Sequence, residues 1–159
     1  MRDSLQLSVR SFGINDLELF GRWLEKRHVK DFFGDPQIWI KEVSLNLSRN
    51  SDWITYFIVE IDGSPMGFFQ YYDTSKAPDG VWSDTPDRTA GIDYLIGEEQ
   101  YLGKGVGSEI IRTIVLMIKE LGWYRYLIAD PDPSNVSSIE VLKRNGFILQ
   151  NNGLYMLDL

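Results

Sequence analysis

The sequence of 159 residues contains no cysteine and a single histidine, His28. Without cysteine the chain has no disulfide framework, no thiolate nucleophile and no zinc–thiolate site. It also lacks an apolar run of the roughly 18 residues that a membrane-spanning helix needs. The N-terminus has no apolar stretch typical of a secretion signal. We therefore expect a soluble, cytoplasmic protein with no metal and no membrane partner.

Basic residues are fewer than acidic ones, with 16 Lys and Arg against 23 Asp and Glu and a net charge of −7. Such a charge repels nucleic acid and favours cationic ligands, although an acidic surface also serves solubility alone. Aromatic residues, by contrast, make up 13% of the chain and include five Trp. Because Trp and Tyr often line ligand pockets, composition predicts a small cationic partner and no nucleic acid.

The order of the expected elements predicts one layered domain over residues 1–159. Apolar alternation and β-branched or aromatic composition predict strands at 5–9, 53–61, 66–73, 90–97, 123–130, 147–150 and 154–159. Capping residues and helical spacing predict four helices, which begin near residues 16, 35, 105 and 134. Residues 27–36 break the pattern of the first helix, and residues 74–90 form the one long loop. We expect an α/β or α+β fold around a mixed sheet.

A glycine-rich turn, Gly103-Lys104-Gly105-Val106-Gly107-Ser108, lies between an expected strand and an expected helix. Glycines allow positive φ there and let a ligand approach the backbone closely. Amides at the positive end of a helix form a cradle for phosphate or pyrophosphate. The spacing fits neither a Walker loop nor a dinucleotide-binding fingerprint. The turn is either a pyrophosphate cradle of another kind or a connector without a ligand.

In these residues the sequence resembles the GNAT superfamily of acyl-CoA-dependent N-acyltransferases. The family motif (Gln/Arg)-x-x-Gly-x-Gly/Ala falls on residues 102–107, and a second motif falls on Ser134-Asn135 and Asn145-Gly146-Phe147. The resemblance implies a mixed, mostly antiparallel sheet of about seven strands flanked by four helices. Two positions depart from the family. Leu102 stands at the Gln/Arg position, and Leu142 stands where many members have a Tyr that protonates the departing thiolate.

The resemblance implies acetyl-CoA as co-substrate, bound without a metal. Its pyrophosphate would lie on the amides of 103–108 and its pantetheine arm along 92–97, with amides near Leu95 and Ile96 holding the thioester carbonyl. Asn135 would meet the arm from the next helix. The implied cofactor-binding residues are Leu95, Ile96, Gly103, Lys104, Gly105, Val106, Gly107, Ser108 and Asn135.

Within the superfamily the sequence most resembles aminoglycoside 6′-N-acetyltransferases, which confer antibiotic resistance. The matching stretches are residues 28–35, 68–75, 79–85, 91–96, 102–107 and 130–135. Asp93 interrupts an otherwise apolar strand, where a carboxylate needs a partner. The resemblance implies that Asp93 binds the acceptor ammonium and accepts its proton, directly or through water, and the alternative is a structural ion pair with an Arg or Lys. The expected substrate-binding residues are Asp130, Gln70, Tyr72, Trp82 and Phe33. Asp130 would be a second anchor for the cation, or else a carboxylate that is stabilised by the positive end of a helix dipole.

For three further side chains we expect no part in catalysis. We expect Phe32 to pack in the core, His28 to cap or pack rather than catalyse, and Tyr94 to point to the face of its strand opposite Asp93. That direction makes Tyr94 a poor proton donor for the thiolate. Asp93 would then return the amine's proton through water.

The sequence thus predicts direct transfer of an acetyl group to an amine of a small polycation, by a monomer or a homodimer. The alternatives are a siderophore-pathway lysine-type N-acyltransferase, which needs a basic pocket residue, and a non-catalytic acyl-CoA-binding module, which does not need Asp93. A protein N-terminal acetyltransferase would need an open peptide groove, which the long loop disfavours.

Overall fold

The computed structural model describes residues 6–78, 82 and 84–159, and over these residues the chain forms one seven-stranded sheet and five α-helices. The strands are β1 (Leu7–Ser11), β2 (Ile54–Ile61), β3 (Ser64–Asp73), β4 (Thr89–Ile96), β5 (Tyr126–Ala129), β6 (Ile148–Leu149) and β7 (Tyr155–Asp158). The helices are α1 (Leu17–Glu25), α2 (Arg27–Phe33), α3 (Pro36–Arg49), α4 (Val106–Glu120) and α5 (Val136–Arg144). The sheet order is β1-β2-β3-β4-β5-β7-β6, in which only the β4–β5 pair is parallel. The expected fold class is confirmed.

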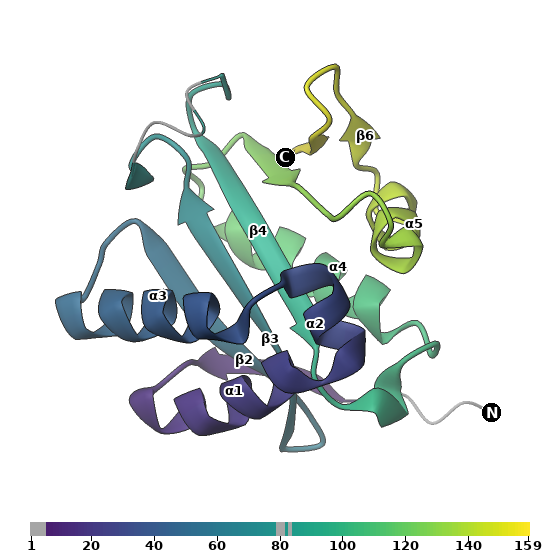
Figure 1. Ribbon diagram of the computed structural model, residues 1–159. Helices are drawn as coiled ribbons and strands as arrows, with labels where there is room; N and C mark the ends of the chain where they lie inside the picture. Colours follow the sequence, from purple (N-terminus) through teal and green to yellow (C-terminus); the bar gives the residue numbers. More distant parts are fainter. Residues whose placement is uncertain (1–5, 79–81, 83) are drawn as a thin grey trace.

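Helices cover both faces of the sheet (Figure 1). On one face α4 buries the apolar stripe that its sequence predicts, and Ile110, Ile114 and Ile118 are almost completely inaccessible. On the other face α1 inserts Phe20 and Trp23 against β2, β3 and β4. Apolar burial on this scale, at roughly 25 cal/mol per Å², is the main force that holds the two helical layers on the sheet. In the described part of the chain no helix is long and apolar enough to cross a membrane.

The segment 27–36, which we expected to interrupt the helices, forms the additional helix α2 and the start of α3. Lys26 is extended and ends α1, and Gly34, with φ of +76°, ends α2 after seven residues. Asp35 then caps α3, because its carboxylate accepts a hydrogen bond of 2.9 Å from the amide of Gln37. The number of helices is therefore five rather than four over the described residues.

The sheet splits between β4 and β5. These strands pair only from Thr89↔Tyr126 to Ile92↔Ala129, where β5 ends. β4 continues to Ile96, paired with β3 alone. In the part of the chain that the structure describes, no strand pairs with the other edge of residues 93–96. This open edge faces the chain that leads from β5 into α5, and ligands in open sheets gather at the carboxyl ends of strands in this way.

Candidate functional site

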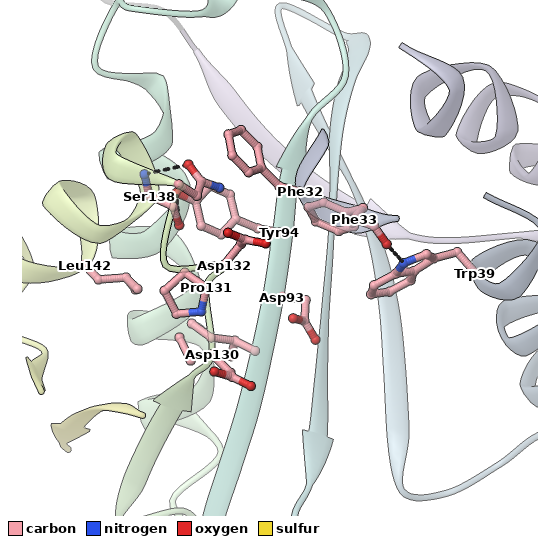
Figure 2. Close-up of a pocket in the computed structure, with 13 residues that line it drawn as sticks. Phe32, Phe33, Trp39, Asp93, Tyr94, Asp130, Pro131, Asp132, Ser138 and Leu142 are labelled. Atoms are coloured by element: carbon pink, nitrogen blue, oxygen red, sulfur yellow. Dashed lines mark hydrogen bonds between the residues drawn. The ribbon is translucent and has the colours of Figure 1, made fainter. Parts of the chain in front are cut away.

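Three adjoining cavities follow the split. The glycine-turn cavity, of about 700 Å³, lies between the turn 103–108, β4, α2 and α5. The junction cavity, of about 180 Å³, lies around the end of β5 (Figure 2). The α3 cavity, of about 580 Å³, lies between α3, β3 and Trp82. The junction cavity shares Tyr94, Asn135 and Ser138 with the first cavity and Asp93 and Asp130 with the third, so it connects the two.

The glycine-rich turn has the geometry of an anion cradle. Gly103 and Gly105 have φ of +70° and +79°, and Gly105 is the N-cap of α4. No side chain caps the first amides of this 15-residue helix, so they remain available to a ligand at its positive end. A Cβ atom built on Gly103 or Gly105 would meet nothing within 4 Å. The backbone here is therefore open to the cavity, as a bound pyrophosphate requires.

Most of the expected cofactor residues line this cavity. They are Leu95, Ile96, Gly103, Gly105, Val106, Gly107, Ser108 and Asn135. Lys104 is exposed and is not part of the cavity wall.

The cap of α5 is also different from our expectation. Asn135, rather than Ser134, caps the helix by accepting a hydrogen bond of 3.2 Å from the amide of Ser138. Ser134 instead donates its hydroxyl to Asp132. The capping bond uses the side-chain oxygen of Asn135 and leaves its NH₂ group for a ligand.

The open edge of β4 presents the amide of Ile96. Nε2 of His28 donates a hydrogen bond of 2.8 Å to the carbonyl of Ile96, whereas the carbonyl of Leu95 faces β3, only 2.5 Å from a Cβ built on Gly67. The N–H and C=O of one strand residue point to the same side, and successive residues alternate. The N–H groups of Ile96 and Tyr94 therefore face the split, while Leu95 contributes cavity wall. His28 packs against the strand, as expected.

Asp93 is partly buried where the junction and α3 cavities meet. Its carboxylate accepts a hydrogen bond of 2.9 Å from the side-chain amide of Gln70, which lies directly across the β3–β4 ladder. Burial raises the pKa of Asp93 to about 6, and the hydrogen bond from Gln70 opposes part of that shift. The neighbouring carboxylates of Asp130 and Glu42 make smaller contributions to this rise, which the value of about 6 includes.

The ion pair that we considered for Asp93 is not formed. None of the ion pairs within residues 6–78, 82 and 84–159 involves this carboxylate. The partner of Asp93 is the neutral amide of Gln70. An anion held in this way is free to bind a cation or to accept a proton near neutral pH.

The expected substrate-binding residues lie around the same two cavities. Asp130 is exposed on the wall of both, and Gln70, Tyr72 and Trp82 line the α3 cavity. The ring of Trp82 lies 5.8 Å from that of buried Tyr72. Phe33 lines the junction cavity.

Phe33 is held in place by Trp39. The rings of the two side chains lie 5.1 Å apart, and the indole of Trp39 donates to the Phe33 carbonyl. Phe32, expected in the core, is instead 37% exposed and lines two cavities, because α2 turns it away from the sheet. Residues 79–81 and 83 of the expected loop lie outside the described residues.

The sequence analysis did not identify one face of α3 as part of the candidate site. Trp39, Glu42, Asn46 and Arg49 recur at spacings of three and four residues and line the α3 cavity. That spacing, which places polar groups beside a Trp, was the available signal. Glu42 adds a third carboxylate to Asp93 and Asp130, and Arg49 is a basic residue of the same cavity.

Tyr94 points to the face of β4 opposite Asp93, as expected (Figure 2). This direction nevertheless brings it into the site, because Tyr94 lines both the glycine-turn and junction cavities. Its hydroxyl lies 3.4 Å from the hydroxyl of Ser138 on α5. Leu142, one turn further along α5, lines the junction cavity with an apolar side chain.

Comparisons with known proteins agree with this fold. The chain is 26% identical over 147 residues to aminoglycoside N(6′)-acetyltransferase type 1 of Klebsiella pneumoniae, a match that covers 89% of this chain and 73% of that protein. Its structure is similar to that of aminoglycoside acetyltransferase AAC(6′)-Ib in complex with coenzyme A and kanamycin, with a TM-score of 0.83, 24% identity and coverage of 96% and 95%. It is also similar to an uncharacterized protein of Bacillus halodurans, with a TM-score of 0.82, 22% identity and coverage of 97% and 84%. The family model described as acetyltransferase (GNAT) domain matches residues 14–153, and the chain belongs to this family.

Proposed function

We propose that this chain is an acetyl-CoA-dependent N-acetyltransferase that acts on the 6′-amine of an aminoglycoside. The observation that carries the proposal is the position of Asp93. Its carboxylate has a raised pKa and lies where the junction cavity, which adjoins the glycine-turn cavity, meets the α3 cavity with its carboxylates and aromatic rings. The names of the relatives, which include aminoglycoside N(6′)-acetyltransferases, support the same substrate class.

The donor would be held by the backbone more than by side chains. The amides that follow Gly103 and Gly105 would bind its pyrophosphate, and the open edge of β4 would take its pantetheine arm as an added strand. The bound donor supplies an activated thioester. The amide of Ile96 would donate a hydrogen bond to the thioester carbonyl and stabilise the negative charge that develops on its oxygen.

Asp93 would bind the acceptor ammonium and take its proton, directly or through water. A base is most effective when its pKa is near the working pH, and burial brings Asp93 to about 6. Gln70 would keep the carboxylate oriented. Because the chain has no cysteine, we propose direct transfer within a ternary complex.

The remaining amino groups of a polycationic acceptor would be bound by Asp130 and Glu42. Both carboxylates line the α3 cavity, where Trp82 and Tyr72 offer flat apolar surface to a sugar ring or a cation. This arrangement recognises an acceptor with several amines better than one with a single amine. A role in resistance to aminoglycosides follows from this substrate class.

A siderophore-pathway lysine-type acyltransferase is the second candidate, and Arg49 is the observation that favours it. Such an acceptor carries its own carboxylate, which a basic side chain of the α3 cavity could bind. Three carboxylates of the same cavity, Glu42, Asp93 and Asp130, would repel it. The balance of charge therefore favours a polycation.

The test is acetyl-CoA turnover, followed by release of the free thiol, across a panel of aminoglycosides with and without a 6′-amine, simple diamines, lysine derivatives and peptides. We expect turnover that depends on the 6′-amine, with a product acetylated at that nitrogen. Turnover with lysine derivatives alone would support the second candidate. Binding of acetyl-CoA without turnover of any amine would support a non-catalytic module.

A further inference from the structure

The leaving thiolate needs a proton, and α5 has no tyrosine that could donate one. At the position where the resembling family often has Tyr, this chain has Leu142, which is 1% exposed and packs in the core with one edge on the junction cavity. A free thiol ionises with a pKa of about 8.5, so a thiolate released near neutral pH takes up a proton. The donor must lie where the two reactants meet.

The residues that line both the glycine-turn and the junction cavities define that meeting point. Within the described ranges they are Phe32, Phe33, Tyr94, Asn135 and Ser138. Only Tyr94 and Ser138 of this set carry a hydroxyl, and their oxygens are 3.4 Å apart. Tyr94 is the more acidic of the two, because a phenol ionises far more readily than an aliphatic alcohol.

Tyr94 is also on the correct side of β4. It follows Asp93 in the strand and points to the opposite face, toward α4 and α5 (Figure 2). A Cβ built on Gly107, inside the first turn of α4, would lie 3.7 Å from the Tyr94 hydroxyl. The base and the phenol therefore approach the open edge of β4 from opposite faces, so that one can accept the proton of the amine while the other reaches the departing sulfur.

We propose that Tyr94 is the general acid of this enzyme, in place of the tyrosine that α5 lacks, and this proposal rests on the proposed N-acetyltransferase function. Tyr94 donates its phenolic proton to the sulfur as the C–S bond breaks and the C–N bond forms. The ammonium nitrogen loses two protons in all. Asp93 takes the first and passes it to solvent so that the neutral amine can attack, then accepts the second as the C–N bond forms and later releases it to solvent. Ser138 relays a proton from solvent back to the phenolate, so that both groups return to their starting states.

The surroundings of Tyr94 suit a donor. Burial raises its pKa, so the hydroxyl stays protonated across the neutral range. The charged or titratable side chains that line the two cavities around it are Asp93, Asp130, Asp132, Glu140, Arg144, His28 and Tyr101. None of them is altered by a Tyr94→Phe substitution, so the variant isolates the hydroxyl.

The experiment compares Tyr94→Phe with Tyr71→Phe, a matched control on β3. Tyr71 is half-buried against Phe57 and Tyr124 and lines none of the three cavities. We expect Tyr94→Phe to lower kcat by about 10²-fold, the lower end for a positioned acid, with calorimetric affinities for acetyl-CoA and acceptor unchanged. Tyr71→Phe should leave kcat at the parent value.

A second readout needs no turnover. The thiol of bound CoA is titrated by the ultraviolet absorbance of its thiolate in the parent enzyme and in both variants. A phenol that donates to sulfur stabilises the thiolate, so Tyr94→Phe should raise the pKa of the bound thiol by roughly one unit. Ser138→Ala should slow turnover less than Tyr94→Phe does and leave this pKa near the parent value.

An unchanged thiol pKa in Tyr94→Phe, or kcat near that of the parent, would overturn the proposal and leave Asp93 to return the proton through water. Because the titration uses CoA alone, it tests Tyr94 even if the amine panel shows that the acceptor is not an aminoglycoside.

Discussion

At the scale of single residues, the chemistry depends on a carboxylate with a neutral hydrogen-bond partner. Asp93 must be ionised to accept a proton, and its pKa of about 6 means that the ionised fraction rises with pH through that value. We expect kcat/KM to fall on the acidic side of about pH 6. Asp93→Asn should remove this acidic limb and lower kcat by about 10²–10⁴-fold, with acetyl-CoA affinity nearly unchanged. Turnover near the parent value at neutral pH would leave Asp93 as a structural residue.

The same carboxylate should lower the stability of the fold. Its pKa is raised from 3.8 to about 6, so between these values the native state binds more protons than the unfolded state. The free energy of unfolding therefore decreases as pH rises through this window and stays reduced above it. We expect Asp93→Asn to be more stable at pH 7 by about 1–3 kcal/mol, since one pKa unit corresponds to 1.36 kcal/mol.

Urea unfolding of both proteins at pH 4 and pH 7 measures this effect. The difference between them should be small at pH 4 and reach its full size at pH 7. Equal stability of the two proteins at pH 7 would show that the Asp93 pKa is close to its ordinary value in the folded state.

At the scale of elements, the glycine turn should act through its backbone conformation and not through packing. Gly105 and Gly122 lie at opposite ends of α4, have φ of +79° and +71°, and would each place a Cβ in open space. A Val at either position suffers similar backbone strain, of order 1–3 kcal/mol. Only Gly105→Val puts a branched side chain where a pyrophosphate would approach.

We expect Gly105→Val to abolish measurable acetyl-CoA binding in calorimetry, while Gly122→Val binds as the parent does. Thermal melts should show that both variants fold, with similar losses of stability. Unchanged acetyl-CoA affinity in Gly105→Val would remove the assignment of this turn to the donor.

Elements with local signals could be predicted from the sequence, and elements held by distant contacts could not. The cap Asp35 of α3, the positive-φ pair Asp62-Gly63 of the β2–β3 turn and Gly146 after α5 depend on neighbouring residues alone. α2 has only seven residues and no side-chain cap, so its formation depends on tertiary contacts such as those of buried Val29. The hydrophobic and capping pattern of the sequence therefore did not predict α2.

The candidate site likewise has features that the sequence predicts and features that depend on distant contacts. Asp93 stood out as a charge inside an apolar strand, and the glycine turn stood out by spacing. The partner of Asp93 depends on the β3–β4 register across a loop, which opposes Gln70 and Asp93. The contribution of Glu42 depends on how α3 lies over the sheet. Neither arrangement is encoded within one segment.

At the scale of the whole molecule, negative charge is spread over the chain and is also concentrated in the α3 cavity. The net charge of −7 attracts any cation, but Glu42, Asp93 and Asp130 converge on one cavity. A polycation would neutralise several of these carboxylates at once. Its binding should therefore weaken with salt, because partly exposed charge pairs are screened over about 8 Å at physiological ionic strength.

Asp130→Asn and Glu120→Gln separate the local contribution from the general one. Each removes one negative charge, yet Asp130 lines two cavities, whereas Glu120 is exposed at the end of α4 and lines none of the three. We expect Asp130→Asn to raise KM for a polycationic acceptor by roughly three- to tenfold, as loss of a partly exposed pair implies, and to change kcat little. The dependence of KM on salt should become shallower in Asp130→Asn and stay as in the parent in Glu120→Gln.

Equal effects of the two substitutions would assign the attraction to net charge alone. A fall in kcat with unchanged KM would instead place Asp130 in the chemical step, because an interaction made only in the transition state affects kcat and not substrate binding.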